Sequence, residues 1–374
     1  MEISYPGKAA AVSLLKEIQP ASFSPPLDVR LLGKMNFLIK GENLTSLQAL
    51  NRGGLAGKIK LIYIDPPYAT GSTFKISAGR ANTVSSSKLD PIAYADDLKG
   101  VEFLEFIRRR LILLRELLAD DGSIYLHIDY KIGHYVKVIM DEVFGRQFFR
   151  NDITRIKCNP KNFHRKAYGN IKDMILFYSK GPSPTWNDAV VPLSAEEGSR
   201  LFKKSAPNGR KYTTIPLHAP GETDGPTGKE WKGMKPPKGR HWRTDPAVLS
   251  RWDMEGLIEW SKNGVPRKKI FLDEKAGKKL QDIWSFKDPA HPVYPTEKNI
   301  DLIKTIIMAS SNPGDIVLDC FAGSGTTLLA AEQLNRGWIG IDESKHAFDV
   351  ITSRLSKDAE LALSERSILS LKQK

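Results

Sequence analysis

Cysteine is scarce in this sequence, with only Cys158 and Cys320 among 374 residues. Two thiols so far apart cannot supply a disulfide framework or the four ligands of a zinc site, so we expect no structural metal. The chain also lacks an apolar run of about 20 residues, the length that spans a bilayer. The amino terminus lacks the basic-then-apolar order of a signal peptide. We therefore expect a cytoplasmic protein with no membrane segment.

Acidic residues are in the minority, with 43 Asp and Glu against 56 Lys and Arg, which gives a net charge of +13. The excess is concentrated in residues 151–290, which hold 27 Lys and Arg against 16 Asp and Glu. A basic region of this kind favours a polyanionic partner. A solvated surface that keeps the protein soluble is the alternative.

Residues 59–68 combine a short apolar strand with a rigid turn. Residues 59–64 are apolar except for Lys60, and three of the six are β-branched isoleucines, which is typical of a strand buried on both faces of a parallel sheet. Asp65 follows at once, and Pro66 and Pro67 fix the backbone and donate no amide hydrogens. Because ligands bind at the carboxyl ends of parallel strands, we expect a reaction site here.

Strand and helix patterns alternate over much of the chain. The predicted strands cover 38–40, 59–64, 123–128, 173–178, 316–319 and 338–342, and the helices 104–118, 134–144, 300–307 and 347–363. This alternation predicts an α/β fold with a doubly wound, mostly parallel sheet. The polar stretch 69–97 is too long for an ordinary connection. We expect a loop that covers the substrate, with a disordered segment as the alternative.

Composition divides the chain into five parts. Prolines predict an extended arm over 1–30, the α/β patterns fill 31–180 and 290–358, and a polar tail covers 359–374. Residues 181–289 are rich in proline and glycine, and their aromatic residues alternate with basic ones. We expect this region to be a separate module inserted into the α/β core.

A second glycine turn follows the predicted strand 316–319. Gly323 and Gly325 allow close approach of a ligand, and Asp342 ends the next strand, where an acid commonly holds a ribose. Leu328 stands where the dinucleotide motif has a third glycine, and no phosphate-binding lysine follows Gly325. NAD and ATP therefore fit poorly, and S-adenosylmethionine fits better. The alternative is a tight turn and a helix cap without a ligand.

The two turns together resemble the motifs of the β class of DNA amino-methyltransferases. The motif Asp65-Pro66-Pro67-Tyr68 precedes the inserted region, and a Phe-x-Gly-x-Gly turn follows it. The resemblance covers about residues 32–358. It implies a Rossmann-like catalytic domain with permuted motif order, S-adenosylmethionine as cofactor, and target recognition by region 181–289. The strands that carry the two motifs should then be neighbours in space despite their separation in sequence. Segments 239–242 and 269–274 are similar to modification subunits of type III restriction systems and to solitary enzymes. Because those subunits are usually longer, we favour a stand-alone or type II-like enzyme.

The same resemblance implies roles for individual residues. Asp65, Pro66, Pro67 and Tyr68 match the residues that hold the target base. The implied cofactor-binding residues are Glu42, Asn43, Thr296, Lys298, Asp319, Phe321, Ala322, Gly323, Ser324, Gly325, Thr326 and Asp342. Segment 41–43 resembles a region near the adenine of the cofactor, and segment 294–298 one near its methionine. Many relatives carry Asn where this chain has Ala69, so a cofactor or loop contact differs here.

The residues agree with this chemistry. The amine of adenine is a poor nucleophile that a duplex hides, so the base has to be flipped out. The Asp65 carboxylate and the Pro66 carbonyl can accept the two amine hydrogens while Tyr68 stacks on the base. Cytosine-C5 methylation needs a cysteine nucleophile, typically after proline, and neither cysteine follows one. Both cysteines are therefore predicted to be packing residues.

The predicted DNA-binding residues lie in the inserted region. They are Arg240, Trp242, Arg243, Arg267 and Lys268, with phosphate contact as the default role. His127 and His134 are expected to be structural, because nothing near them in sequence completes a catalytic dyad.

The sequence thus predicts an S-adenosylmethionine-dependent DNA adenine-N6 methyltransferase that acts on double-stranded DNA. Cytosine-N4 methylation is the nearest alternative, although those enzymes more often carry Ser at the position of Asp65. A non-catalytic DNA-binding relative is another alternative, and methylation of a protein glutamine is less favoured. A homodimer and a restriction-endonuclease partner are both possible assemblies.

Overall fold

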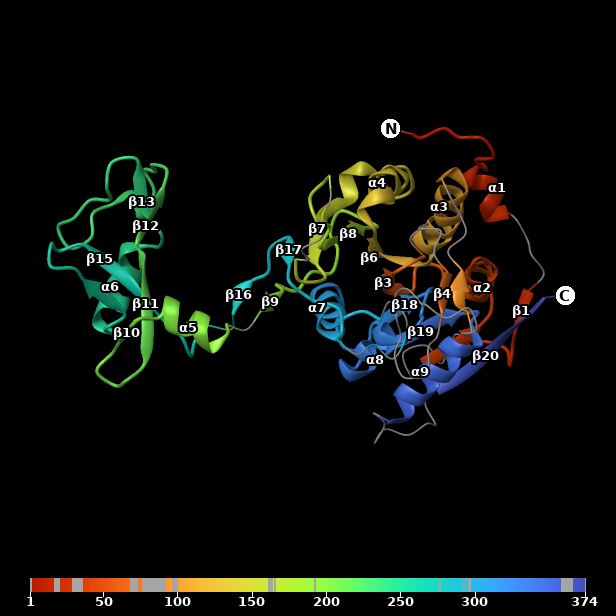
Figure 1. Cartoon of the computed structure of the whole chain (residues 1–374). Helices are drawn as coiled ribbons and strands as arrows, with labels where there is room; N and C mark the ends of the chain where they lie inside the picture. Colours follow the sequence, from red (N-terminus) through yellow and green to blue (C-terminus); the bar gives the residue numbers. More distant parts are fainter. Residues whose placement is uncertain are drawn as a thin grey trace. The chain divides into compact units, whose positions relative to one another are not determined.

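The computed structural model describes residues 2–16, 21–28, 36–67, 73–75, 92–95, 100–160, 164, 166–191, 193–275, 277–290, 292, 294, 297–357 and 366–373. The chain forms two compact units (Figure 1). One unit comprises Met1–Ala189 and Gln281–Lys374, and the other comprises Val190–Leu280. The second unit is shorter at both ends than the module predicted at 181–289.

The larger unit is built on one sheet of ten strands among the described residues. In sheet order these are β1 (Ala21–Ser24), β20 (Arg366–Gln373), β2 (Asn36–Lys40), β19 (Gly337–Asp342), β18 (Ile316–Asp319), β3 (Ile59–Ile64), β6 (Leu118–Ile128), β8 (Lys172–Ser179), β7 (Phe149–Ile156) and β17 (Ile283–Trp284). Neighbours are parallel from β20 to β6 and between β7 and β17. The pairs β1–β20, β6–β8 and β7–β8 are antiparallel.

Helices connect and cover this sheet. They are α1 (Ala11–Lys16), α2 (Asn43–Leu50), α3 (Gly100–Leu117), α4 (Tyr130–Phe144), α7 (Ile300–Ser310), α8 (Thr326–Gln333) and α9 (Lys345–Lys357). The connection from β3 through α3 to β6 and that from β18 through α8 to β19 run in opposite directions along the sheet. Because such crossovers are right-handed, α3 and α8 cover opposite faces. The predicted doubly wound, mostly parallel α/β fold is confirmed. Within the described ranges, none of the helices has the length and apolarity needed to cross a bilayer.

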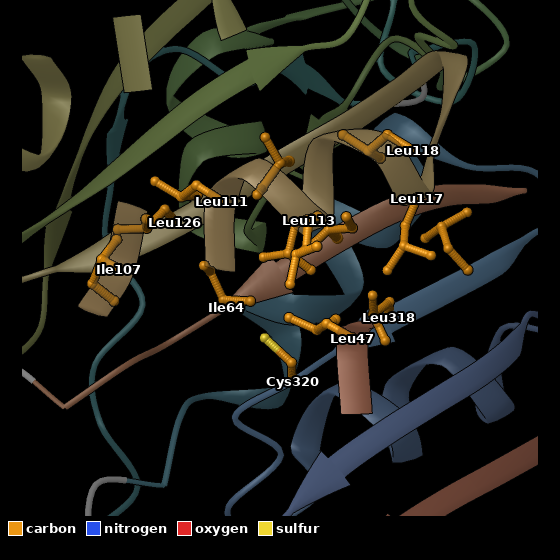
Figure 2. Close-up of a cluster of buried hydrophobic side chains, with 14 of the residues drawn as sticks. Leu47, Ile64, Ile107, Leu111, Leu113, Leu117, Leu118, Leu126, Leu318 and Cys320 are labelled. Atoms are coloured by element: carbon orange, nitrogen blue, oxygen red, sulfur yellow. The ribbon is translucent and has the colours of Figure 1, made fainter. Parts of the chain in front are cut away.

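The hydrophobic core lies where α2 and α3 pack on the centre of the sheet. Figure 2 shows side chains of β3, β6 and β18 meeting those of the two helices. Ile107, Leu111 and Leu114 of α3 are buried, as their spacing predicts. Leu118 begins β6, whereas the sequence placed it at the end of the helix. Cys320 is buried in the same cluster, so its predicted packing role is confirmed.

Both chain ends differ from the prediction. The predicted arm over 1–30 contributes α1, with Leu14 buried, and the edge strand β1. The predicted tail over 359–374 contains β20, which pairs with β2 and β1 and buries Leu369. Phe23 of β1 and Leu369 of β20 are buried where these strands add to the sheet, a long-range effect that composition does not register.

The predicted loop over 69–97 lies mostly outside the described residues. Two short strands within it, β4 (Thr73–Lys75) and β5 (Ile92–Ala95), pair antiparallel. The stretch therefore contains some regular backbone pairing that its sequence did not predict.

The smaller unit contains short strands and two helices. A four-stranded sheet has the order β10 (Lys204–Ser205), β11 (Lys211–Pro216), β15 (Pro266–Phe271) and β14 (Ile258–Trp260). Two antiparallel pairs join β12 (His218–Pro220) to β13 (Arg240–Trp242) and β9 (Val190–Val191) to β16 (Lys278–Lys279). The helices are α5 (Ala195–Leu201) and α6 (Pro246–Met254). The core consists of Leu217, Trp231, Trp242, Leu249 and Ile258.

Candidate functional site

The two sequence motifs meet at one edge of the large sheet. Strands β18 and β3 are parallel neighbours, with Val317 opposite Leu61 and Leu318 opposite Ile62. Asp65 therefore leaves β3 at the same sheet edge where Asp319 ends β18. The predicted proximity of these two distant strands is confirmed.

The glycine turn after β18 is closed by backbone hydrogen bonds. Gly323 and Gly325 have φ values of 50° and 74°, a conformation that glycine adopts without a steric penalty. A Cβ atom on Gly325 would lie 2.8 Å from Cγ1 of Ile351 on α9. The Gly325 amide donates to the Ala322 carbonyl at 2.7 Å, and the Ala322 amide donates to the carbonyl of Ile341 at 3.1 Å. The turn is thus fixed to the end of β19.

Two acidic residues hold the backbone around this turn. The Gly323 and Ser344 amides donate to the two carboxylate oxygens of Asp342, each at 2.8 Å. The Phe321 amide donates to Oδ1 of Asp319 at 3.0 Å. Burial raises the pKa of Asp319 to about 7 and also raises the pKa of Asp342. The edge therefore concentrates buried acid groups that favour a cation or a hydrogen-bond donor.

The remaining residues of the turn have defined partners. The Ser324 and Thr326 hydroxyl oxygens are 2.9 Å apart, and the Arg354 guanidinium donates to the Ser324 carbonyl at 3.1 Å. Ala322 is buried. The Phe321 ring centroid lies 6.1 Å from that of Phe106 on α3. These contacts fix the turn between α9 and α3.

Glu42 and Asn43, predicted to lie near the cofactor adenine, are held by Arg110. The Arg110 guanidinium donates to Oε1 of Glu42 and to Oδ1 of Asn43, both at 2.6 Å. The Asn43 amide donates to the Cys320 carbonyl at 3.0 Å. Burial lowers the pKa of Arg110 to about 10. This arrangement ties the start of α2 to the end of β18, and Arg110 is an organising residue that sequence reasoning missed.

A pocket lies beside these residues. It has a volume of about 430 Å³ and is lined by Leu44, Phe106 and Arg110, among others. The Arg110 guanidinium carbon lies 3.4 Å from the Phe106 ring centroid. The pocket thus has apolar walls together with charged ones of both signs, since Glu102 and Glu105 line it as well, and it shares Phe106 with the contact to the glycine turn.

Lys298, predicted to contact the cofactor, forms an ion pair with Asp65. The Lys298 side chain is 9% exposed and that of Asp65 is 15% exposed. Pro66 is buried and Pro67 is half-buried. Tyr68 and Thr296 lie outside the described residues. The ion pair joins the target-base motif to the segment predicted to contact methionine.

Three of the predicted DNA-binding arginines lie around one histidine in the smaller unit. The pKa of His218 is lowered first by burial and then by the charges of Arg240, Arg243 and Arg267. Arg240 and Arg243 are exposed. The Arg267 guanidinium also donates to the Thr214 hydroxyl and carbonyl, both at 2.9 Å. The three cations form a compact basic cluster.

The other two predicted DNA-binding residues have different surroundings. The Lys268 ammonium lies 3.3 Å from the Trp252 ring centroid, and burial lowers its pKa. Trp242 is only 3% exposed, and its indole N–H donates to the Lys229 carbonyl at 2.9 Å. The prediction that Trp242 binds DNA is therefore wrong, because its ring fills the core of the smaller unit. Alternation of aromatic and basic residues does not show which aromatic rings are buried.

His127, expected to be structural, is fully buried and has hydrogen-bond partners on two neighbouring strands. The Tyr63 hydroxyl is 2.9 Å from Nδ1 of His127, and Oδ2 of Asp173 is 3.2 Å from its Nε2. These side chains come from β3, β6 and β8. Their sequence separation hid the cluster.

A mostly parallel sheet with a glycine turn and acidic strand ends at one edge defines a ligand-binding α/β protein. The sequence profile of the N6/N4 methyltransferase family, described as DNA methylase, matches residues 59–353. The chain belongs to this family, as its motifs predict.

The chain is similar to several individual proteins. The type II methyltransferase M.EcaI of Enterobacter cloacae is 46% identical over 315 residues, which cover 82% of this chain and 67% of that protein. The StyLTI Mod subunit, a type III restriction-modification enzyme of Salmonella typhimurium, is 28% identical over 335 residues. That match covers 80% of this chain and 50% of the Mod subunit, so the chain spans half the length of that relative. The crystal structure of the M1.HpyAVI-SAM complex is similar at a TM-score of 0.44 and 20% identity, over 85% of this chain and 99% of that one.

Proposed function

We propose that the chain transfers a methyl group from S-adenosylmethionine to the N6 amine of an adenine flipped out of double-stranded DNA. The observation that carries this proposal is the pairing of β3 with β18. It brings the end of β3, with Asp65 and Pro66, to the same sheet edge as the glycine turn. A base at one turn and a cofactor at the other then lie close enough for direct transfer.

The described residues fit S-adenosylmethionine. Its cationic methionine end matches the Asp319 carboxylate at the end of β18, its ribose hydroxyls match the Asp342 carboxylate at the end of β19, and its carboxylate matches Lys298. Its adenosine is of a size that suits the pocket beside Asn43, which Leu44 and Phe106 line. The bound cofactor supplies an electrophilic methyl group.

The protein's own residues orient the nucleophile. The Asp65 carboxylate and the Pro66 carbonyl accept the two amine hydrogens, so that the nitrogen lone pair points at the methyl group. Charge develops on the amine as the bond forms, and the fixed Asp65 carboxylate stabilises it. Tyr68 is proposed to stack on the flipped base.

The smaller unit is proposed to recognise the DNA target. The cluster of Arg240, Arg243 and Arg267 supports this role, because guanidinium groups bind phosphate oxygens and guanine edges. The type III relative is a Mod subunit of a restriction-modification enzyme, which favours a nuclease partner for this chain as well. A homodimer and a cytoplasmic location remain part of the proposal.

Mass spectrometry of nucleosides from treated plasmid DNA tests the reaction. We expect N6-methyladenine with the wild-type chain and labelled S-adenosylmethionine. Formation of N4-methylcytosine alone contradicts the adenine assignment and favours the second chemistry that the family name covers. A chain that shifts DNA in a gel but transfers no label is a non-catalytic relative.

A further inference from the structure

A buried chain of polar side chains starts two residues before Asp65. The Tyr63 hydroxyl is 2.9 Å from Nδ1 of His127, whose Nε2 is 3.2 Å from Oδ2 of Asp173. All three residues are at most 2% exposed. Buried polar groups cost free energy unless they are fully hydrogen-bonded, and apolar residues of similar shape are often as stabilising. Core packing alone therefore does not explain this row of hydrogen-bonded side chains.

The two hydrogen bonds that link these side chains run in the same direction, from Tyr63 toward Asp173. Burial lowers the pKa of His127, so the imidazole is neutral at pH 7. Burial alone raises the pKa of Asp173, but the hydrogen bonds from His127 and Lys157 and the charge of Lys157 outweigh burial and lower the pKa, so Asp173 is ionised. A carboxylate only accepts hydrogen bonds, so Nε2 of His127 carries the proton and donates to it. Nδ1 then accepts from the Tyr63 hydroxyl.

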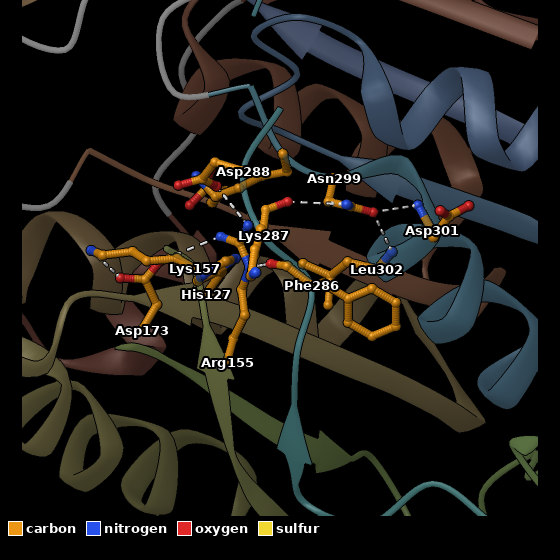
Figure 3. Close-up of polar contacts among 12 residues, drawn as sticks. His127, Arg155, Lys157, Asp173, Phe286, Lys287, Asp288, Asn299, Asp301 and Leu302 are labelled. Carbon is orange, nitrogen blue, oxygen red and sulfur yellow. Dashed lines mark hydrogen bonds and ion pairs between the residues drawn. The ribbon is translucent and has the colours of Figure 1, made fainter. Parts of the chain in front are cut away.

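The row of polar contacts continues across the sheet from Asp173 (Figure 3). The Lys157 ammonium donates to Oδ1 of Asp173 at 2.6 Å, and Arg155 is 3.4 Å from Oδ2. The Arg155 guanidinium also donates to the Asp288 carboxylate at 2.5 Å and to the Phe286 carbonyl at 2.7 Å. The polar chain thus ends on the segment that follows β17.

This segment leads back to the site. The Asn299 side chain donates to the Lys287 carbonyl at 3.0 Å and caps the first turn of α7 (Figure 3). The residue before it, Lys298, pairs with Asp65. Polar contacts and short stretches of backbone therefore form a closed ring from Asp65 through Tyr63, His127, Asp173 and Arg155 to Lys298.

Strand register shows why the ring begins at Tyr63. Strand β3 ends at Ile64, so Tyr63 is the last but one residue of the strand and Asp65 follows directly after its end. Tyr63 is opposite Tyr125 of β6, and the next residue, Ile64, is opposite Leu126. The same register brings His127 next to the Asp65 end of β3.

We propose that Tyr63, His127, Asp173 and Arg155 are positioning residues that hold Asp65 and Lys298 at a fixed separation for methyl transfer. This inference rests on the proposed function, because it concerns the geometry of the reacting carboxylate. A displacement of about 1 Å at a reacting group can lower a rate by up to about 100-fold. Loss of the ring should therefore lower the transfer rate more than it lowers stability or binding.

The test compares two tyrosines on the same face of the sheet. Tyr63→Phe removes the hydroxyl at the start of the ring. Tyr125→Phe is the matched control, because the Tyr125 hydroxyl is also buried and hydrogen-bonded, 2.7 Å from the Ser310 hydroxyl, but lies outside the ring. Single-turnover methyl transfer, cofactor and DNA affinity, and melting temperature are measured for both full-length variants.

We expect Tyr63→Phe to lower the single-turnover rate roughly tenfold and Tyr125→Phe less than about twofold, with binding unchanged in both. Melting temperatures should fall by similar amounts, because each variant loses one buried hydroxyl contact. Equal rates in the two variants, or a rate loss in Tyr63→Phe that follows lost binding, would overturn the inference. Asp173→Asn, folded as judged by circular dichroism, should reproduce the Tyr63→Phe rate. A wild-type chain that methylates no DNA refutes the proposed function, and the inference with it.

Discussion

The ion pair between Asp65 and Lys298 yields a prediction whose size follows from burial. The two side chains are 15% and 9% exposed, so both charges are largely removed from water. Replacing Lys298 with methionine leaves the Asp65 carboxylate without this cation. Negative charge is already concentrated there, since Asp65 contributes to the raised pKa of Asp319. We expect Lys298→Met to lower the free energy of unfolding by about 3 kcal/mol.

A double-mutant cycle isolates the pair. Asp65→Asn leaves the Lys298 ammonium without its carboxylate and should also destabilise the protein. The variant with both substitutions contains neither charge, so it should be more stable than the sum of the single changes indicates. We expect a coupling free energy of about 2 kcal/mol.

Calorimetric unfolding of the four proteins measures this coupling. Each 1 kcal/mol corresponds to about 2 °C in the melting transition of a unit of this size. Lys60→Met is a matched control on β3, because Lys60 pairs with Asp121 at 2.5 Å but the Asp121 side chain is 45% exposed. The ion pair of Lys60 and Asp121 should contribute less than about 1 kcal/mol to the free energy of unfolding. A coupling free energy below about 0.5 kcal/mol refutes the reasoning. A loss of unfolding free energy in Lys60→Met equal to that in Lys298→Met also refutes it.

Four further predictions concern the glycine turn and the smaller unit. Because the folded pKa of Asp319 is about 7 and its ordinary value is 3.8, the folded state holds this proton more tightly. Stability should therefore fall as the pH rises from about 4 to 7, by at most about 4 kcal/mol, and Asp319→Asn should flatten that profile in thermal unfolding. Gly325→Ala should lower the free energy of unfolding by about 1 to 3 kcal/mol, because the φ of Gly325 is 74° and Ile351 is close. The same variant should bind the cofactor more weakly in calorimetry. Trp242→Ala should destabilise the smaller unit by about 3 to 5 kcal/mol. Arg243→Ala should leave the melting temperature unchanged but weaken DNA binding and lower its salt dependence by about one counterion.

The sequence predicted the features that short-range patterns encode. The apolar run before Asp65 and the glycine turn after Asp319 identified two strand ends, and the motif order predicted that these strands are neighbours. The helix spacing of Ile107 and Leu111 identified the face that packs on the sheet. Periodicity and turn chemistry are local, so a single sequence is enough to read them.

The remaining features depend on contacts between distant segments. Strand β7 has two adjacent exposed residues and buried residues only in its second half, and its sequence was not predicted as a strand. Leu369 of β20 is buried where this strand adds to the sheet beside β2 and β1. His127 and Asp173 each looked like an isolated polar residue, because their contacts join separate strands. Trp242 was misassigned because a basic neighbourhood in sequence does not show which face of a strand is exposed.

The most direct test of the central claim separates chemistry from binding at Asp65. Asp65→Asn keeps the size of the side chain and one oxygen acceptor but removes the charge. We predict that the single-turnover rate of methyl transfer to adenine falls roughly 100-fold or more, while the dissociation constant of S-adenosylmethionine changes less than about twofold. Loss of transfer and of cofactor binding in equal proportion would contradict the assignment of Asp65 as the group that orients the amine.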